Sequence, residues 1–134
     1  MRVNKTTVIA AMLVAGLAGC AMPRPDNPVA AVADCPAFIE VRYGQGGMPS
    51  VVPDECAVAQ NTDVMWRGPD GNPTIFAIKF TTATPVWEDE RLEAVSTRVG
   101  SYQEVKKKMT AKPGTYKYAI KANGKVLDPA IIIR

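Results

Sequence analysis

Few residue types in this 134-residue chain could do chemistry, because it contains three cysteines and no histidine. Without an imidazole the chain lacks the commonest general base near neutral pH, and serine–histidine and cysteine–histidine nucleophile pairs are excluded. Carboxylates remain, in the neighbours Asp54 and Glu55 and in the acidic run 88–90. Neighbours in sequence seldom face one another across a substrate, so we name no catalytic residue and expect no enzyme.

The first twenty residues have a character of their own. Arg2 and Lys5 precede an uncharged apolar run, residues 7–19. This run is too short to cross a ~30 Å hydrocarbon core as a helix but suits the apolar region of a signal peptide. Its end, Leu-Ala-Gly-Cys at 17–20, resembles the lipobox of bacterial lipoproteins. The resemblance implies cleavage before Cys20 and attachment of lipid, such as palmitate, to that residue; an ordinary secretory signal with an incidental cysteine is the alternative.

Lipidation of Cys20 would decide where the mature chain resides. Two or more acyl chains make membrane anchoring stable, whereas one would be marginal. Ala21 follows the lipidated position, where lipoproteins of enteric type usually need Asp to stay on the inner membrane. We therefore expect a lipid-anchored protein of the bacterial cell envelope, with the periplasmic face of the outer membrane favoured. Removing the signal, residues 1–19, also removes Arg2 and Lys5 and lowers the formal net charge from +3 to +1, so nucleic acid is not an expected partner.

The two remaining cysteines, Cys35 and Cys56, fit an exported protein. An even pair in an oxidising compartment predicts a disulfide. A thiol pair for metal or redox work is the alternative, but the chain offers neither a CxxC spacing nor a histidine beside it. Residues 20–34 contain three prolines and no bulky apolar anchor, so we predict an extended tether there and a globular domain over 35–134.

Alternating apolar and polar residues predict strands through most of the domain. The clearest segments are 38–43, 64–67, 74–80, 116–121 and 131–133. In 74–80 the alternation places Phe76, Ile78 and Phe80 on the core face. The dipeptide Asn123-Gly124 marks a tight hairpin or short loop. The fold class predicted is therefore all-β, a small Greek-key β-sandwich with at most one short helix.

The region 84–109 is ambiguous. Leu92, Val95 and Val99 fit a helical stripe, whereas Val95, Thr97 and Val99 equally fit an alternating strand. An early proline, acidic residues after it and a glycine at position 100 favour a short helix.

The basic run Lys106–Lys108 has two interpretations as well. It could contact a membrane surface or an anionic ligand. Solvated lysines that protect a sheet edge from aggregation are the favoured interpretation.

Two stretches resemble the cupredoxins. The run at 64–80 resembles their strand–turn–strand arrangement, and Gly-Thr-Tyr-Lys-Tyr-Ala-Ile at 114–120 resembles the segment leading into their copper loop. The resemblance implies a sandwich fold, but the copper of that family needs two imidazoles and a thiolate. This chain has no histidine, and Thr74 and Ile120 stand where the first His and the Cys would be. We therefore expect no copper or other cofactor and no metal ligands, with packed side chains near Trp66, Thr74 and Ile120.

Two functions fit these observations. The first is a membrane-anchored, non-catalytic, cupredoxin-like module that binds a protein partner in the envelope. The second is a binder of a small ligand or an inhibitor of a foreign hydrolase, with Trp87, Tyr102 and the glycine-rich loop 44–47 lining a groove for sugar or peptide. For each aromatic residue, partial burial in the sandwich is the favoured interpretation.

Overall fold

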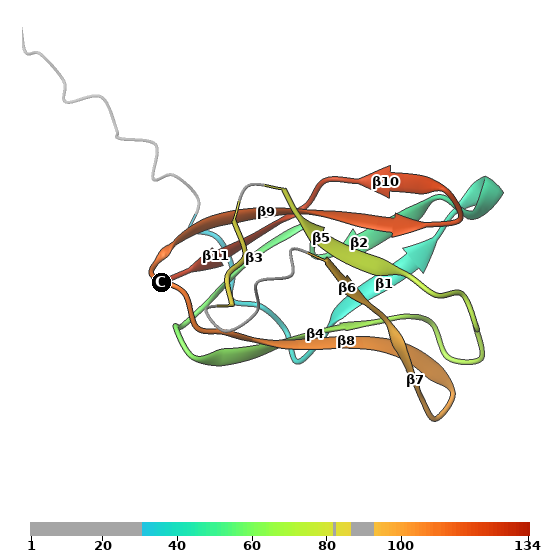
Figure 1. Cartoon of the computed structure of the whole chain (residues 1–134), viewed down its shortest axis with the longest axis horizontal. Coiled ribbons are helices and arrows are strands. Elements are labelled where there is room, and N and C mark those ends of the chain that lie inside the picture. The colour runs from blue at the N-terminus through green and yellow to red at the C-terminus, as the bar shows by residue number, and fades with distance from the viewer. Residues whose placement is uncertain (1–30, 82, 87–92) are drawn as a thin grey trace, which may run out of the picture. The chain divides into compact units, whose positions relative to one another are not determined.

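The computed structural model describes residues 31–81, 83–86 and 93–134, which form a sandwich of two mixed β-sheets (Figure 1). The first sheet has the order β2-β1-β4-β8-β7, and the second β3-β11-β9-β5-β6 with β10 added to β9. The strands are β1 Ile39–Tyr43, β2 Pro49–Val52, β3 Glu55–Val58, β4 Thr62–Arg67, β5 Ala77–Phe80, β6 Glu93–Val95, β7 Thr97–Val99, β8 Tyr102–Met109, β9 Gly114–Ala122, β10 Lys125–Leu127 and β11 Ala130–Ile133. The all-β prediction is confirmed.

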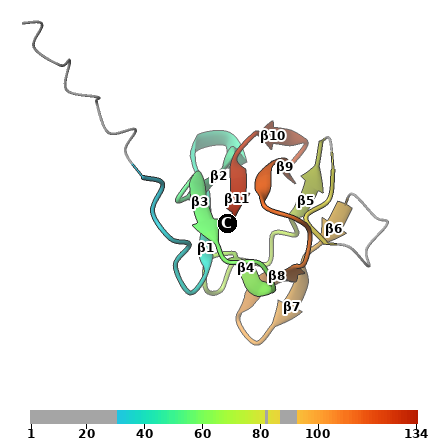
Figure 2. The ribbon, with the colours of Figure 1, turned by 90° about the vertical axis from the view of Figure 1, so that its left-hand side faces the viewer.

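The chain changes sheet at both flanks of the sandwich. Strand β2 is an edge of the first sheet and leads through Pro53 and Asp54 into β3, an edge of the second. On the other flank Ser96 alone separates β6, an edge of the second sheet, from β7, an edge of the first. Seen end-on, the strands form a flattened ring (Figure 2).

The core lies between the sheets and follows the predicted alternation. Phe76, Ile78 and Phe80 are buried, as are Val64 and Trp66. Such burial contributes about 1.5–3 kcal/mol for each large apolar side chain. The residues that face the other way, such as Met65 and Lys79, remain at least partly exposed.

A tyrosine secures the connection between β8 and β9. The hydroxyl of Tyr116 donates a 2.7 Å hydrogen bond to the carbonyl of Lys112, four residues upstream. A tyrosine that bonds the backbone a few residues before it is a recurrent feature of Greek-key sandwiches.

The predicted helix in 84–109 is wrong for the part that the structure describes. Residues 93–109 form β6, β7 and β8, with a hairpin between Val99 and Tyr102. Gly100 has φ +60° at the first central position of this two-residue turn, where a type II′ turn requires glycine. The β-branched residues of 95–99 pair along two sheet edges, so pairing in the sheets overrode the weak helical stripe. Residues 87–92 lie outside the described residues.

The only helix among the described residues is the three-residue 3-10 turn η1, Gln45–Gly47, within the predicted glycine-rich connection. In the described part of the chain, no helix has the length and apolar character needed to cross a bilayer.

The predicted β9–β10 hairpin is confirmed at Asn123-Gly124. Both residues have positive φ, +53° and +73°, as a type I′ turn demands. Asn123 Nδ2 donates to the Gly47 carbonyl at 3.0 Å, and Lys125 Nζ donates to the Gly46 carbonyl at 2.8 Å. The hairpin therefore holds the η1 loop in place.

The segment before Cys35 lies next to the last residue of the chain, Arg134. The N–H of Cys35 bonds the Ala57 carbonyl, and the N–H of Ala57 bonds the Ala33 carbonyl, both at 2.9 Å. The Arg134 side chain donates to Asp34 at 3.1 Å and to the Val32 carbonyl. The residues just before Cys35 thus pair along the edge of β3.

Candidate functional site

The outer face of the first sheet carries a stacked arginine. The guanidinium carbon of Arg67 lies 3.8 Å from the ring centroid of Tyr102 and 5.0 Å from that of Phe38. Arg67 Nη2 donates a 2.8 Å hydrogen bond to Asp70 Oδ1, which also accepts from Ser101 Oγ at 3.1 Å. We name these five residues, Phe38, Arg67, Asp70, Ser101 and Tyr102, the arginine cluster.

Strand register brings the cluster together. Arg67, the last residue of β4, pairs with Glu40 of β1 and with Glu104 of β8. Side chains two residues apart share a face of a sheet. Phe38 and Tyr102, each two residues before one of those glutamates, therefore lie on the same face as Arg67.

The loop after β4 positions Asp70. The N–H of Gly68 bonds the Gln103 carbonyl at 2.8 Å, and the N–H of Gly71 bonds the Ser101 carbonyl at 2.7 Å. Gly71 has φ +75°, a conformation that favours glycine because other side chains are strained there. The loop after β4 thus holds the Asp70 carboxylate beside Ser101 and Arg67.

The charges of the cluster are fixed near neutral pH. Hydrogen bonds from Arg67 and then from Ser101 lower the pKa of the Asp70 carboxyl, so it is ionised. The guanidinium of Arg67 supplies the opposite charge. Its side chain is 27% exposed, so its ion pair with Asp70 is only partly screened by water.

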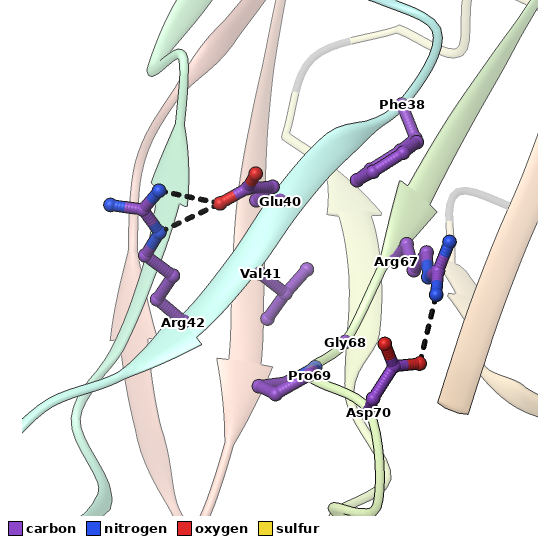
Figure 3. A pocket seen from close by; sticks show the side chains of 8 residues that line it. All are labelled: Phe38, Glu40, Val41, Arg42, Arg67, Gly68, Pro69 and Asp70. Atoms are coloured by element: carbon purple, nitrogen blue, oxygen red, sulfur yellow. Dashed lines mark hydrogen bonds and ion pairs between the residues drawn. The ribbon is translucent and has the colours of Figure 1, made fainter. Parts of the chain in front are cut away.

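A groove of about 310 Å³ opens beside the cluster, between β1 and the loop after β4 (Figure 3). It is lined by Phe38, Glu40, Val41, Arg42, Arg67, Gly68, Pro69 and Asp70. On the β1 side, Arg42 Nη2 lies 2.5 Å from Glu40 Oε2. Each wall thus carries one cation paired with one anion, and the groove has no net charge.

A smaller pocket of about 90 Å³ has Tyr102 in its wall, together with Arg98, Asn72 and the neighbouring turn residues. Tyr102 therefore lines this pocket and stacks on Arg67, which lines the groove.

The predicted disulfide between Cys35 and Cys56 is present, with an S–S distance of 2.04 Å. It fastens Cys35, at the start of the predicted domain, to β3. Cys20, the predicted lipidation site, lies outside the described residues. No group of three or more Cys, Asp or Glu able to hold a metal ion occurs among the residues that the structure describes.

Packed side chains are the expectation near Trp66, Thr74 and Ile120. Trp66 and Ile120 are both 0% exposed, as expected. Thr74 is only partly buried, and its carbonyl accepts a 3.5 Å hydrogen bond from the Tyr43 hydroxyl. Packed side chains are thus confirmed at two of the three positions.

The remaining candidates are dispersed. Asp54 and Glu55 line a separate depression with Asp128 and Lys117, and residues 88–90 lie outside the described residues. Of the groove predicted for the ligand-binding alternative, Tyr102 stacks on Arg67, the loop 44–47 contacts the β9–β10 hairpin, and Trp87 is outside the described residues. The described contacts give Tyr102 and this loop different neighbours.

Sequence reasoning missed the arginine cluster except for Tyr102. The spacing of Arg67 and Asp70, three residues apart across a turn, was the visible signal. Phe38 and Tyr102 are distant in sequence and meet Arg67 only through strand pairing.

No protein-family model matches the chain, and a comparison with curated proteins finds no match.

Proposed function

We propose that the protein is a lipid-anchored, non-catalytic module of the bacterial cell envelope that binds a protein partner through the arginine cluster. The observation that carries the binding proposal is the fixed guanidinium of Arg67 between two aromatic rings at the mouth of an open groove. Arginine and tyrosine are enriched among the residues that dominate binding energy in protein interfaces. Residues that are already ordered lose less conformational entropy on binding.

The anchor is proposed from the sequence. The lipobox at 17–20 places lipid on Cys20, and the proline-containing stretch after it supplies an extended spacer. The folded domain is consistent with a tethered role, because the segment just before Cys35 lies beside Arg134, while the loop after β4 and the β7–β8 hairpin lie at the other end of the sandwich (Figure 1).

The cupredoxin-like character of the domain is also a proposal. The two stretches that carry the resemblance contain β4, β5 and β9. Strands β5 and β9 pair along four residues, and Trp66 of β4 contacts Tyr118 of β9 across the core. These contacts support the resemblance at the level of fold, and fold alone does not assign a function.

Lipidation is tested by expressing the full precursor with radiolabelled palmitate. We expect label on the wild-type chain and none on a Cys20→Ser variant. Equal labelling of both would overturn the lipidation of Cys20, and an unlabelled wild type would overturn the anchor.

Partner binding is tested by chemical crosslinking in intact envelopes, followed by purification of the lipidated protein. We expect one stoichiometric partner with the wild type and with Lys79→Ala, a control on the other sheet. Arg67→Ala should weaken recovery at least about tenfold, as expected for a dominant interface residue. Circular dichroism must show that the Arg67→Ala variant folds. Equal recovery with all three proteins, or no stoichiometric partner, contradicts the proposal.

A further inference from the structure

The groove beside Arg67 presents side chains to solvent. Val41 lines it but is only 1% exposed, because its side chain belongs to the core. Phe38 and Pro69 are half-buried, so part of each residue stays open to solvent. Phe38 directly precedes β1 and Pro69 lies in the loop after β4, so they come from different walls of the groove (Figure 3). Each wall therefore offers an apolar ring to an inserted group.

Hydrogen-bond donors and acceptors accompany these two rings. On the β1 wall, Arg42 bonds Glu40 Oε2 through Nε at 2.9 Å and through Nη2 at 2.5 Å. On the other wall, Arg67 bonds Asp70 Oδ1 through Nη2 at 2.8 Å. Within the described part of the chain, Nη1 of each arginine and the second oxygen of each carboxylate make no hydrogen bond. Both walls can therefore donate to a bound polar group and accept from it.

The charge and size of the groove restrict its occupant. Two cations and two anions cancel, and each paired carboxylate would repel a second anion on its arginine, so a neutral occupant is favoured. Apolar rings flanked by donors and acceptors match a group with an apolar body and a polar tip. A phenol has this form, because its hydroxyl both donates and accepts. The volume of about 310 Å³ is small for a ligand site and suits a single side chain.

We propose that the groove binds a tyrosine side chain of the protein partner, with its ring between Phe38 and Pro69 and its hydroxyl on Arg67. This inference rests on the proposed protein-binding function and names the residue that the partner contributes. Arginine and tyrosine are both enriched among dominant interface residues, and such residues tend to face one another across an interface.

Three small probes test the proposal. N-acetyl-tyrosine amide represents the partner's side chain, N-acetyl-phenylalanine amide lacks only the hydroxyl, and N-acetyl-phosphotyrosine amide carries a charged phosphate in its place. Nuclear magnetic resonance of the purified protein in detergent should show saturable binding of the tyrosine probe at millimolar concentration. The resonances of the Phe38 ring and the Gly68 amide should shift, and the Val58 amide on β3 should not. The phenylalanine probe should bind at least about threefold more weakly, because it loses a hydrogen bond. The phosphotyrosine probe should also bind more weakly than the tyrosine probe.

Two variants and a control assign the contacts. Phe38→Ala removes one ring and should weaken the tyrosine probe at least about threefold. Val126→Ala, at an exposed apolar residue of β10, should leave its affinity unchanged. Arg67→Lys keeps the charge but loses the planar donor set, so the preference for tyrosine over phenylalanine should shrink. A general loss of structure would not change that ratio selectively, and circular dichroism checks that each variant folds.

The tyrosine assignment is wrong if the tyrosine probe does not bind, if the Phe38 ring resonances stay unchanged, or if the phenylalanine probe binds equally well. Tighter binding of the phosphotyrosine probe, or equal binding of methyl glucoside, would overturn it in favour of an anion or a sugar. If the tyrosine probe fails while partner recovery still depends on Arg67, the proposed function stands and only the tyrosine is rejected. If the probe binds but partner recovery does not depend on Arg67, the proposed function fails, and the tyrosine is not the partner's.

Discussion

The indole N–H of Trp66 donates a 3.0 Å hydrogen bond to the hydroxyl oxygen of Tyr118 across the core. Both residues are 0% exposed, and their rings meet edge to face with centroids 5.4 Å apart. The contact links β4 of one sheet to β9 of the other and satisfies a buried donor that water cannot reach.

Replacing Tyr118 with phenylalanine should therefore leave the Trp66 N–H without an acceptor. The expected loss is about 1–3 kcal/mol in the free energy of unfolding, measured by urea denaturation. Tyr43→Phe is the matched control, because the Tyr43 hydroxyl makes a long 3.5 Å bond in a partly exposed position. Equal losses in the free energy of unfolding would show that the hydrogen bond between Trp66 and Tyr118 contributes no more than the bond made by Tyr43.

Alkaline pH should destabilise the protein through the same residue. Burial raises the pKa of the Tyr118 hydroxyl, an effect only partly offset by the hydrogen bond from Trp66. An unfolded tyrosine ionises near pH ~10, so this contribution to stability is complete below that pH. It declines as pH rises toward the higher pKa of the folded state, because only the unfolded chain releases the proton. Urea denaturation between pH 8 and 11 should show a steeper decline for the wild type than for Tyr118→Phe, and parallel curves would contradict this assignment.

Removing the disulfide should cost about 3 kcal/mol, because the two cysteines are 21 residues apart and their bond restricts the unfolded chain. The test compares urea unfolding of the wild type with that of the double variant Cys35→Ala, Cys56→Ala. The wild type in excess dithiothreitol should approach the variant. A difference below ~1 kcal/mol would show that pairing at the β3 edge holds this region without the bond.

Arg134 should govern local opening where the chain joins the domain. Arg134→Ala removes the bonds to Asp34 and to the Val32 carbonyl, so hydrogen exchange should accelerate at the amides of Cys35 and Ala57. Global stability should change by less than ~1 kcal/mol because the ion pair is exposed. Arg42→Ala, which breaks another exposed pair, should leave those two amides unchanged. If hydrogen exchange is unaltered in the Arg134→Ala variant, Arg134 does not hold the segment around Val32 and Asp34 in place.

The sequence predicts local features of this fold better than the contacts that unite distant residues. Side-chain alternation around Phe76 and Ile78 identifies the core face, and Asn123-Gly124 identifies its turn, since both signals depend only on neighbours. The strands at 93–99 contradict the predicted helix. The short run of β-branched residues there fits the periodicity of a helix as well as that of a strand. The arginine cluster depends on the pairing of Arg67 with Glu40 and with Glu104. The register in which strands pair cannot be deduced from a single sequence.

The passages through Pro53 and through Ser96 join the two layers along both long sides. Neither sheet can separate from the other by itself, because continuous backbone joins the two sheets at both edges. Heating should consequently melt both layers in a single transition, with the calorimetric enthalpy equal to the van't Hoff enthalpy.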